Sequence, residues 1–590
     1  MNYELNAPEN KKKLSSWGAL RSLWPMLAGE QSILVYAALA TLANSLVSLV
    51  APLLIAHVVD TYIVSRQFGG VLWFSLILLG LYTFGLFTSY LQTRLMGGVG
   101  QRVLFTLRTR VFAKLQELPV AFFHANKAGD LISRINNDTD KLNQFFSQTL
   151  VQFIGSVVIM FGAGIFLLSI NLTLGAAALA PAAVLLVFTR LISPWVKRTN
   201  AASLTATGGL SAEVSESLNN FKVVVAFNRR DFFRARFAEA NDVNYKTALS
   251  AGIANNTFTP IFGLSSNVAQ LIVLVYGVYL ITTGAFSLGL LIGFLSYVTN
   301  FYNPLRQLAA LWANFQVALA GWDRISAILQ MENTMQIVTA GAAEPHDTKA
   351  LLAFKDVSFR YEGSDENKNV LRRVSFTLEP GKTYALVGPT GGGKTTTASL
   401  MARLYDPTEG AVLLHGRDIR TYTAAERTRN IGFILQEPTL FSGTVRDNIL
   451  YGNEAYADFS NEQLVKVIHD AGLEKLLERF DEGLEAKVAT SGDALSLGQK
   501  QLIAFMRAVL RSPSLLILDE ATANIDTVTE QLLEDILKKL PKTTTRVIIA
   551  HRLNTIENAD EIFFVNGGEV TLAGSMERAV DMLLHGKRKS

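Results

Sequence analysis

Six long apolar stretches in the first 310 residues constrain this chain more than any other feature. Each has close to the roughly 20 residues that an α-helix needs to cross a hydrocarbon layer about 30 Å thick. Of the 590 residues 49% are hydrophobic and 18% charged, and the mean hydropathy of +0.26 is high for a water-soluble chain of this length. We therefore expect six membrane-spanning helices, near residues 32–59, 71–90, 149–170, 174–191, 258–281 and 286–301.

Lysine and arginine are concentrated in two of the connections between these stretches. The second-to-third and fourth-to-fifth connections are long and basic, whereas the other three are short turns. Because cytoplasmic connections retain basic residues, we expect both long connections and both termini in the cytoplasm, and a multi-pass protein of the bacterial inner membrane. The net charge of +4 has the same origin, so we do not expect nucleic-acid binding.

Helical periodicity continues through both long connections. Each has an apolar segment in its middle, at 118–123 and at 221–227. We expect helices that extend into the cytoplasm, with a short crossing turn at each tip that docks on another domain and transmits force. The alternative is a solvated charged face, which the pattern alone does not exclude.

The remaining segments complete the domain organisation. In the polar first 31 residues, Trp17, Leu20 and Trp24 recur at helical spacing, which favours a helix lying in the membrane interface or, equally, one that packs against another helix. The chain has no Cys, which excludes disulfides and cysteine-based sites. We predict a cytoplasmic segment with an interfacial helix at 1–31, an all-α six-helix transmembrane domain at 32–331, a linker at 332–350 and an α/β domain at 351–590.

The strongest chemical motif is the G-x-x-x-x-G-K-T sequence that ends in Lys394 and Thr395. It follows an apolar run at 384–387, typical of a buried strand, and precedes a predicted helix at 395–404. Glycines let backbone N–H groups surround phosphate oxygens, and the helix N-terminus adds partial positive charge. Lys394 would reach the β- and γ-phosphates, and the Thr395 hydroxyl would bind Mg²⁺. The α/β domain at 351–590 is therefore predicted to be a P-loop NTPase nucleotide-binding domain. The residues that we expect to contact ATP here are Gly388, Pro389, Thr390, Gly391, Gly392, Gly393, Lys394, Thr395 and Thr396.

Other polar residues lie at the ends of predicted strands in the same domain. Gln436 ends one strand, and Asp519 and Glu520 end another of four apolar residues. Asp519 is placed to hold Mg²⁺ and Glu520 to polarise the attacking water. His551 ends a third strand and is placed to contact the γ-phosphate, while Tyr361 is placed to stack on adenine.

A second phosphate-facing surface is predicted at Ser496, Gly498 and Gln499, just before a helix expected to begin near Lys500. One nucleotide cannot be held by both surfaces of the same domain. We therefore expect a head-to-tail pair, in which one partner supplies the phosphate loop and the other supplies Ser496.

Taken together, these motifs resemble the ATP-binding cassette (ABC) exporters, and in particular half-transporters that fuse six spans to one nucleotide-binding domain. The resemblance covers nearly the whole chain. It implies that Gln436 is the Q-loop glutamine, which also serves the metal, that Asp526 belongs to the D-loop, that His551 is the switch histidine, and that Glu520 is the general base. It further implies that two chains clamp two ATP molecules and export a lipid, drug or peptide by alternating access.

One departure bears on the partner. The family signature L-S-G-G-Q has Leu497 at its third position here. Such signatures are frequent in heterodimeric exporters with one weak ATP site, so an identical and a different partner chain both stay open. Two other functions also stay open: import of a metal chelate by the same fold, and an ATP-gated channel or regulatory subunit, although an intact Glu520 disfavours the latter.

Overall fold

The computed structural model describes residues 3–5, 18, 24–338, 349–361, 369–488, 495–519, 527–549 and 558–585. The chain divides into two compact units, which we describe separately. One unit holds residues 12–114 and 129–329, and the other holds residues 1–11, 115–128 and 330–590. The predicted interfacial helix lies almost entirely outside the described residues; of that segment only Gly18 and a short 3₁₀ turn, η2 (Trp24–Leu27), are described.

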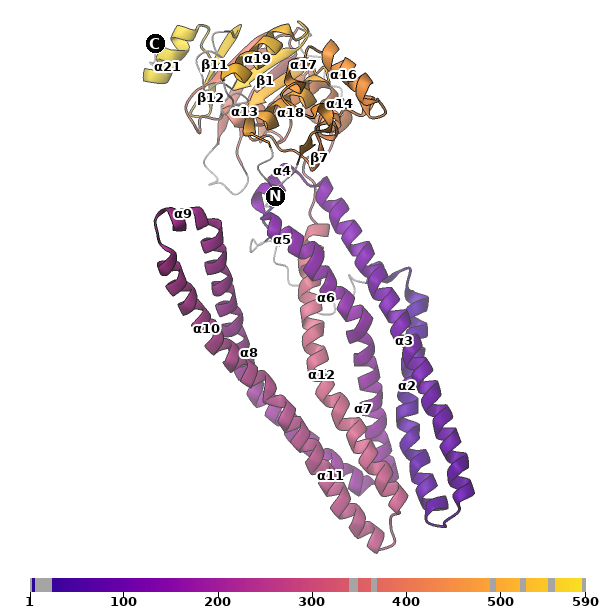
Figure 1. Cartoon of the computed structure of the whole chain (residues 1–590). Coiled ribbons are helices and arrows are strands. Elements are labelled where there is room, and N and C mark those ends of the chain that lie inside the picture. The colour runs from indigo at the N-terminus through magenta and orange to yellow at the C-terminus, as the bar shows by residue number, and fades with distance from the viewer. Residues whose placement is uncertain are drawn as a thin grey trace. The chain divides into compact units, whose positions relative to one another are not determined.

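The first unit is built from long helices (Figure 1). Among the described residues, five helices are long and apolar enough to cross a membrane, at Gln31–Ile63, Phe68–Glu117, Ala128–Ile170, Leu172–Asn219 and Arg230–Thr282. The sixth predicted stretch lies in a further helix that is not among these five. The helices of this unit are α2 (Gln31–Val58), α3 (Phe68–Glu117), α5 (Ala128–Ser133), α6 (Thr139–Gln144), α7 (Leu150–Ile170), α8 (Leu172–Asn219), α9 (Phe221–Ala226), α10 (Arg230–Asn256), α11 (Phe258–Thr282) and α12 (Leu288–Leu329), with π-helical turns η3 (Val59–Ile63), η4 (Arg134–Asp138) and η5 (Phe145–Thr149).

Contacts between α2 and α12 show how the spans are held together. Asp60, just past α2, accepts a hydrogen bond from the backbone N–H of Gly289 at 2.7 Å and so caps α12. A Cβ on Gly289 would lie 2.1 Å from the carbonyl oxygen of Ala56, so the two backbones approach closely only because this residue is glycine. Pro52 cannot donate to the carbonyl of Ser48, and Asn300 supplies that bond instead at 3.0 Å.

The second unit contains the α/β domain. A six-stranded sheet has the order β12 (Glu569–Leu572), β11 (Glu561–Asn566), β3 (Thr383–Val387), β10 (Thr545–Ile549), β9 (Leu515–Asp519) and β6 (Ile431–Ile434). All neighbours are parallel except β11 and β12, so the carboxyl ends of β3, β10, β9 and β6 meet at one edge. A four-stranded antiparallel sheet has the order β2 (Leu371–Leu378), β1 (Leu352–Phe359), β4 (Glu409–Leu414) and β5 (Arg417–Asp418), and β7 (Gly443–Thr444) pairs with β8 (Lys487–Val488).

Helices cover the six-stranded sheet and complete the core. The central strands β3 and β9 are buried along their whole length, as expected for strands of a covered parallel sheet. The helices of this domain are α13 (Lys394–Met401), α14 (Ala424–Asn430), α15 (Val445–Leu450), α16 (Asn461–Asp470), α17 (Glu474–Leu477), α18 (Leu497–Val509), α19 (Thr527–Lys539) and α21 (Met576–His585), with 3₁₀ turns η6 (Ile419–Thr421), η7 (Glu454–Tyr456) and η8 (Gly483–Glu485).

The same unit includes α4 (Val120–Ala125), the short helix that joins α3 to α5 in the chain. Its counterpart in the other unit is α9, which joins α8 to α10 (Figure 1). Both predicted crossing turns are therefore helices of six residues.

Candidate functional site

The phosphate loop connects β3 to α13. Gly388, Gly391 and Gly393 have φ values of +148°, +78° and +113°, which L-residues with side chains rarely adopt. A Cβ on Gly388 would lie 2.0 Å from the carbonyl oxygen of Val565. The loop thus needs glycine both for its conformation and for its close approach to the neighbouring backbone. The exposed tip of the loop is formed by Pro389, Thr390 and Gly391.

Lys394 holds the loop closed. Its ammonium group donates to the carbonyl oxygens of Gly388 at 2.8 Å and Pro389 at 3.2 Å, and only 6% of the residue is exposed. The positive charge therefore lies inside the loop, beside the N-terminus of α13. The helix ends at Met401, earlier than predicted, and Arg403 follows with φ +52°.

Thr395 and Asp519 come from separate segments and meet at the edge of the sheet. The Thr395 hydroxyl lies 3.5 Å from the Asp519 carboxylate, which ends β9 and is 2% exposed. A hydroxyl and a carboxylate in this position are oxygen ligands of the kind that Mg²⁺ prefers, so these residues fit the ion.

Tyr361 belongs to an aromatic cluster beside this site. Its ring lies edge-on to Phe359, with centroids 4.9 Å apart, and to Tyr405, with centroids 5.3 Å apart. Its hydroxyl is 2.9 Å from that of Thr396 on α13. Burial, with a smaller contribution from Tyr361, raises the pKa of Tyr405 to about 12, so this phenol stays neutral and supports the cluster as an apolar group.

The other predicted catalytic residues follow strands of the same sheet. Gln436 is exposed two residues after β6, which pairs with β9. Glu520, Asp526 and His551 lie outside the described residues. The strands that precede Glu520 and His551, β9 and β10, are parallel neighbours, with Asp519 opposite Ile549.

The signature residues begin α18. Ser496 is its N-cap: the hydroxyl accepts from the N–H of Gln499 at 3.1 Å, and the Gln499 side chain accepts from the N–H of Ser496 at 3.0 Å. This capping box starts the helix at Leu497, three residues before the predicted position. Gly498 lies in the first turn of the helix, and Leu497 has helical backbone and a side chain that is 38% exposed.

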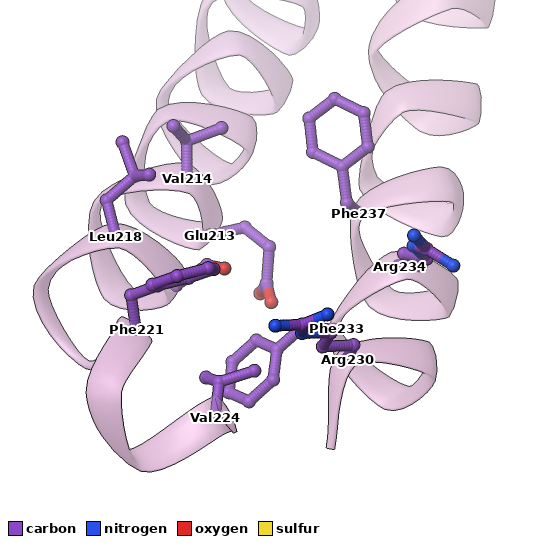
Figure 2. Close-up of a pocket in the computed structure, with 10 residues that line it drawn as sticks. Glu213, Val214, Leu218, Phe221, Val224, Arg230, Phe233, Arg234 and Phe237 are labelled. Carbon is purple, nitrogen blue, oxygen red and sulfur yellow. The ribbon is translucent and has the colours of Figure 1, made fainter. Parts of the chain in front are cut away.

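A cavity of about 550 Å³ is lined by residues of α9 and of the adjoining ends of α8 and α10 (Figure 2). Aromatic and aliphatic side chains form most of its wall, and Figure 2 shows the Glu213 carboxylate between them. Glu213 pairs with Arg236 at 2.8 Å, and its side chain is 10% exposed. The apolar lining residues are Val214, Leu218, Phe221, Val224, Phe233 and Phe237.

Sequence reasoning missed several residues near the site. Tyr405 carries no motif, and only its packing against Tyr361 reveals its place. Tyr3 and Asn126 are nearly fully buried beside α4, although Tyr3 lies in a polar segment of the sequence. A buried tyrosine in a polar segment has no periodic signal that could have identified it.

Two family models match the chain. The ABC transporter transmembrane region matches residues 34–305, and the ABC transporter model matches residues 371–523. The first match lies within the predicted transmembrane domain and the second within the predicted nucleotide-binding domain.

Curated relatives match along almost the whole length. The chain is 32% identical over 574 residues to an uncharacterized ABC transporter ATP-binding protein, YfiC, of Bacillus subtilis, covering 97% of this chain and 94% of the relative. It is 31% identical over 547 residues to a multidrug resistance ABC transporter ATP-binding and permease protein of Lactococcus lactis, covering 92% and 90%. It is 31% identical over 573 residues to an ATP-dependent lipid A-core flippase of Salmonella typhimurium, covering 96% of each.

Proposed function

The chain belongs to the ABC transporters and is an ATPase coupled to transport, and we propose that it exports a hydrophobic or amphipathic substrate as a dimer with alternating access. One observation carries the ATPase part of the proposal. Thr395 of the phosphate loop and Asp519 of β9 meet within 3.5 Å at the edge of the sheet where the phosphate loop begins. This is where the phosphates of ATP and its Mg²⁺ are expected.

In the proposed reaction, each residue acts on one part of the nucleotide. Tyr361 stacks on adenine, and Lys394 leaves its carbonyl partners to pair with the β- and γ-phosphates. Glu520 takes the proton of the attacking water, while His551 and Gln436 orient the γ-phosphate and the water. Mg²⁺, held by Thr395, Asp519 and Gln436, neutralises charge on the phosphates when bound.

The dimer follows from the two phosphate-facing surfaces. The Ser496 hydroxyl accepts from Gln499, which leaves its proton free to donate to a phosphate oxygen of a nucleotide on the partner chain. Gly498 and Asp526 complete this surface in our proposal. The partner is an identical chain or a different half-transporter, and Leu497 is compatible with either because its backbone is helical.

Coupling to transport is assigned to the two helical tips. Val223 and Val225 of α9 and Phe227, just after it, are 55%, 40% and 75% exposed, which is an apolar surface suited to docking. We propose that this surface docks on the partner chain, at a cavity of about 190 Å³ whose wall includes Leu435, Phe441 and Arg507. ATP binding closes the pair, hydrolysis releases it, and the helices follow.

The substrate class rests on the membrane unit and on the relatives. Five helices can span a membrane, and the apolar window of each contains at most two charged residues. Such helices suit an apolar or amphipathic cargo better than an ion. The Lactococcus relative is named for multidrug resistance and the Salmonella relative for a lipid flippase. We place both termini and the nucleotide-binding domain in the cytoplasm and the spans in the bacterial inner membrane.

The decisive test of the ATPase is Glu520→Gln. It removes the base and keeps the shape of the side chain, so ATP binding should persist while turnover falls by about a thousandfold. Phosphate release and ATP affinity are measured on the purified complex, with Glu462→Gln on exposed α16 as the control. Turnover at the parent rate in Glu520→Gln would refute the assignment.

Dimerisation and the direction of substrate transport need separate measurements. The mass of the detergent-purified complex distinguishes one chain from two and shows whether two chain types are present. A fluorescent phospholipid or a hydrophobic dye is then followed in sealed inside-out vesicles. ATP-dependent movement into the vesicle lumen supports export, whereas movement out of the lumen supports import and contradicts the proposal.

A further inference from the structure

Three residues near the start of the chain are packed as if they were part of the α/β unit. We call residues 3–5 the strap. Tyr3 is 1% exposed and Leu5 is 4% exposed, although neither lies in a helix or strand. An irregular segment is buried only where neighbouring groups satisfy its backbone, and two sets of contacts do so here.

The first set of contacts joins the strap to α4. Asn126, just after α4, donates from its side-chain amide to the carbonyl of Tyr3 at 2.8 Å, and its amide oxygen accepts from the N–H of Leu5 at 3.1 Å. The same amide donates to the carbonyl of Phe122 at 2.8 Å. The Tyr3 ring lies edge-on to the Phe122 ring, with centroids 6.4 Å apart. One buried side chain thus pairs with the strap as a neighbouring strand would.

The second set joins the strap to the segment that follows α12. The Tyr3 hydroxyl is 2.6 Å from the hydroxyl of Thr334, and it accepts from the N–H of Thr334 at 3.1 Å. It is also 3.4 Å from the carbonyl of Glu332. Tyr3 therefore fixes this connecting segment with its hydroxyl and α4 with its ring and its carbonyl.

The connecting segment is held in turn by the helix of the phosphate loop. Arg403, two residues beyond α13 and 3% exposed, donates to the carbonyls of Gln336 at 3.0 Å and Met335 at 3.4 Å. Its backbone N–H bonds to the carbonyl of Leu400 inside α13, whose first residue is Lys394. Contacts thus run without a gap from α4 through the strap to the helix that begins at the nucleotide.

A cavity of about 920 Å³ connects the same parts. Its wall includes Tyr3, His124 of α4 and Thr334, and also Tyr361 and Thr395 of the nucleotide site. A nucleotide that stacks on Tyr361 would therefore bind beside the strap.

We propose that the strap is a coupling device that makes α4, the segment after α12 and α13 move as one body when ATP binds. The inference rests on the proposed function, because ATP binding drives the movement. It adds the strap, which is not among the residues assigned to the ATP site. Without the strap, α4 and the segment after α12 would lose the hydrogen bonds that Tyr3 makes with Asn126 and with Thr334. Tightly packed side chains transmit a movement from one element to the next, and an element that loses this packing can move independently.

The test compares hydrogen exchange of the α4 amides with and without Mg²⁺ and ATP, on the purified full chain in lipid nanodiscs. In the parent, we expect ATP to slow exchange at 120–126 by about fivefold or more. In Tyr3→Ala the ATP effect should fall below about twofold, while the KM for ATP stays within about twofold of the parent. Tyr245→Ala, whose tyrosine on α10 is 62% exposed, is the matched control and should behave as the parent.

Tyr3→Phe separates coupling from folding. It keeps the ring against Phe122 and removes the hydroxyl's contacts with Thr334 and Glu332, so it should fold and should show an intermediate ATP effect. An undiminished ATP effect at α4 in both Tyr3 variants would overturn the proposal. Failure of the proposed ATPase would look different, because the parent itself would then show neither turnover nor an ATP effect.

Discussion

The two helical tips, α4 and α9, have the same length but bury different shares of their apolar side chains. Phe122 of α4 is fully buried, and its neighbours include the strap residue Tyr3. In α9, Val223 and the following Phe227 are 55% and 75% exposed. Both sequences are apolar, V-A-F-F-H-A in α4 and F-K-V-V-V-A in α9. The sequence of a tip therefore does not decide whether its partner lies in the same chain.

This difference agrees with different binding partners for the two tips: α4 packs within its own chain, and α9 is proposed to dock on the partner chain. Within one chain, α4 is buried on the side of Phe122, where Asn126 adds hydrogen bonds, while Phe123 is 45% exposed. The same chain leaves the outer face of α9 exposed, and apolar faces of this kind mark interaction sites. Our proposal that α9 docks on a partner chain gives that face a function, and the following predictions test the contrast.

The largest effect is expected from truncating the buried tip. Phe122→Ala removes a fully buried ring and should lower the free energy of unfolding by about 3–5 kcal/mol. Phe227→Ala, at an exposed position of the other tip, should change it by less than about 0.5 kcal/mol. Thermal unfolding of the purified chains measures both, and equal losses would contradict the contrast between the tips.

The next effect is functional. Val223→Asp combined with Phe227→Asp places two charges on the exposed face of α9. If α9 docks on the partner chain, both carboxylates are buried there without a cation. The free energy of docking should then become less favourable by about 3 kcal/mol, and ATP-driven transport should fall by about a hundredfold. Thermal stability should stay close to the parent, because both positions are exposed.

The control for this pair is Ala248→Asp, an exposed position on α10. It adds the same kind of charge away from the tip, so transport should be unchanged. If the α9 variant transports normally, the exposed face of α9 is not a docking surface.

The sequence predicted the main elements because their signals are local. The apolar stretch at 149–170 became α7 (Leu150–Ile170), and the glycine pattern of the phosphate loop became the positive φ values of Gly388, Gly391 and Gly393. The order and type of the spans and of the strands need little more than periodicity. The start of α18 was misplaced by three residues because the capping box of Ser496 was not taken into account.

The non-local contacts could not be predicted in this way. Asn126 and Tyr3 are 123 residues apart, and nothing in either neighbourhood shows that they pair. The same holds for Asp60 and Gly289, where a carboxylate caps a helix that begins 228 residues later. Contacts between distant segments depend on the whole fold. Local patterns in one sequence therefore predict the motifs and elements of the site, but not the hydrogen bonds that join distant segments.

The smallest effect concerns the ion pair at the base of α9. Arg236→Gln leaves the Glu213 carboxylate, 10% exposed, without its cation, and one Glu213 oxygen has no hydrogen-bond partner among the described residues. Because Arg236 is 42% exposed and solvent screens the pair, the cost should be only about 1 kcal/mol, seen as about fivefold faster hydrogen exchange at 213–236. Arg234→Gln is the control: Arg234 and Asp231 are 79% and 96% exposed, so exchange should not change. Equal effects in the two variants would mean that the base of α9 is solvated like an ordinary surface, and that only α4 is held in place by buried polar contacts.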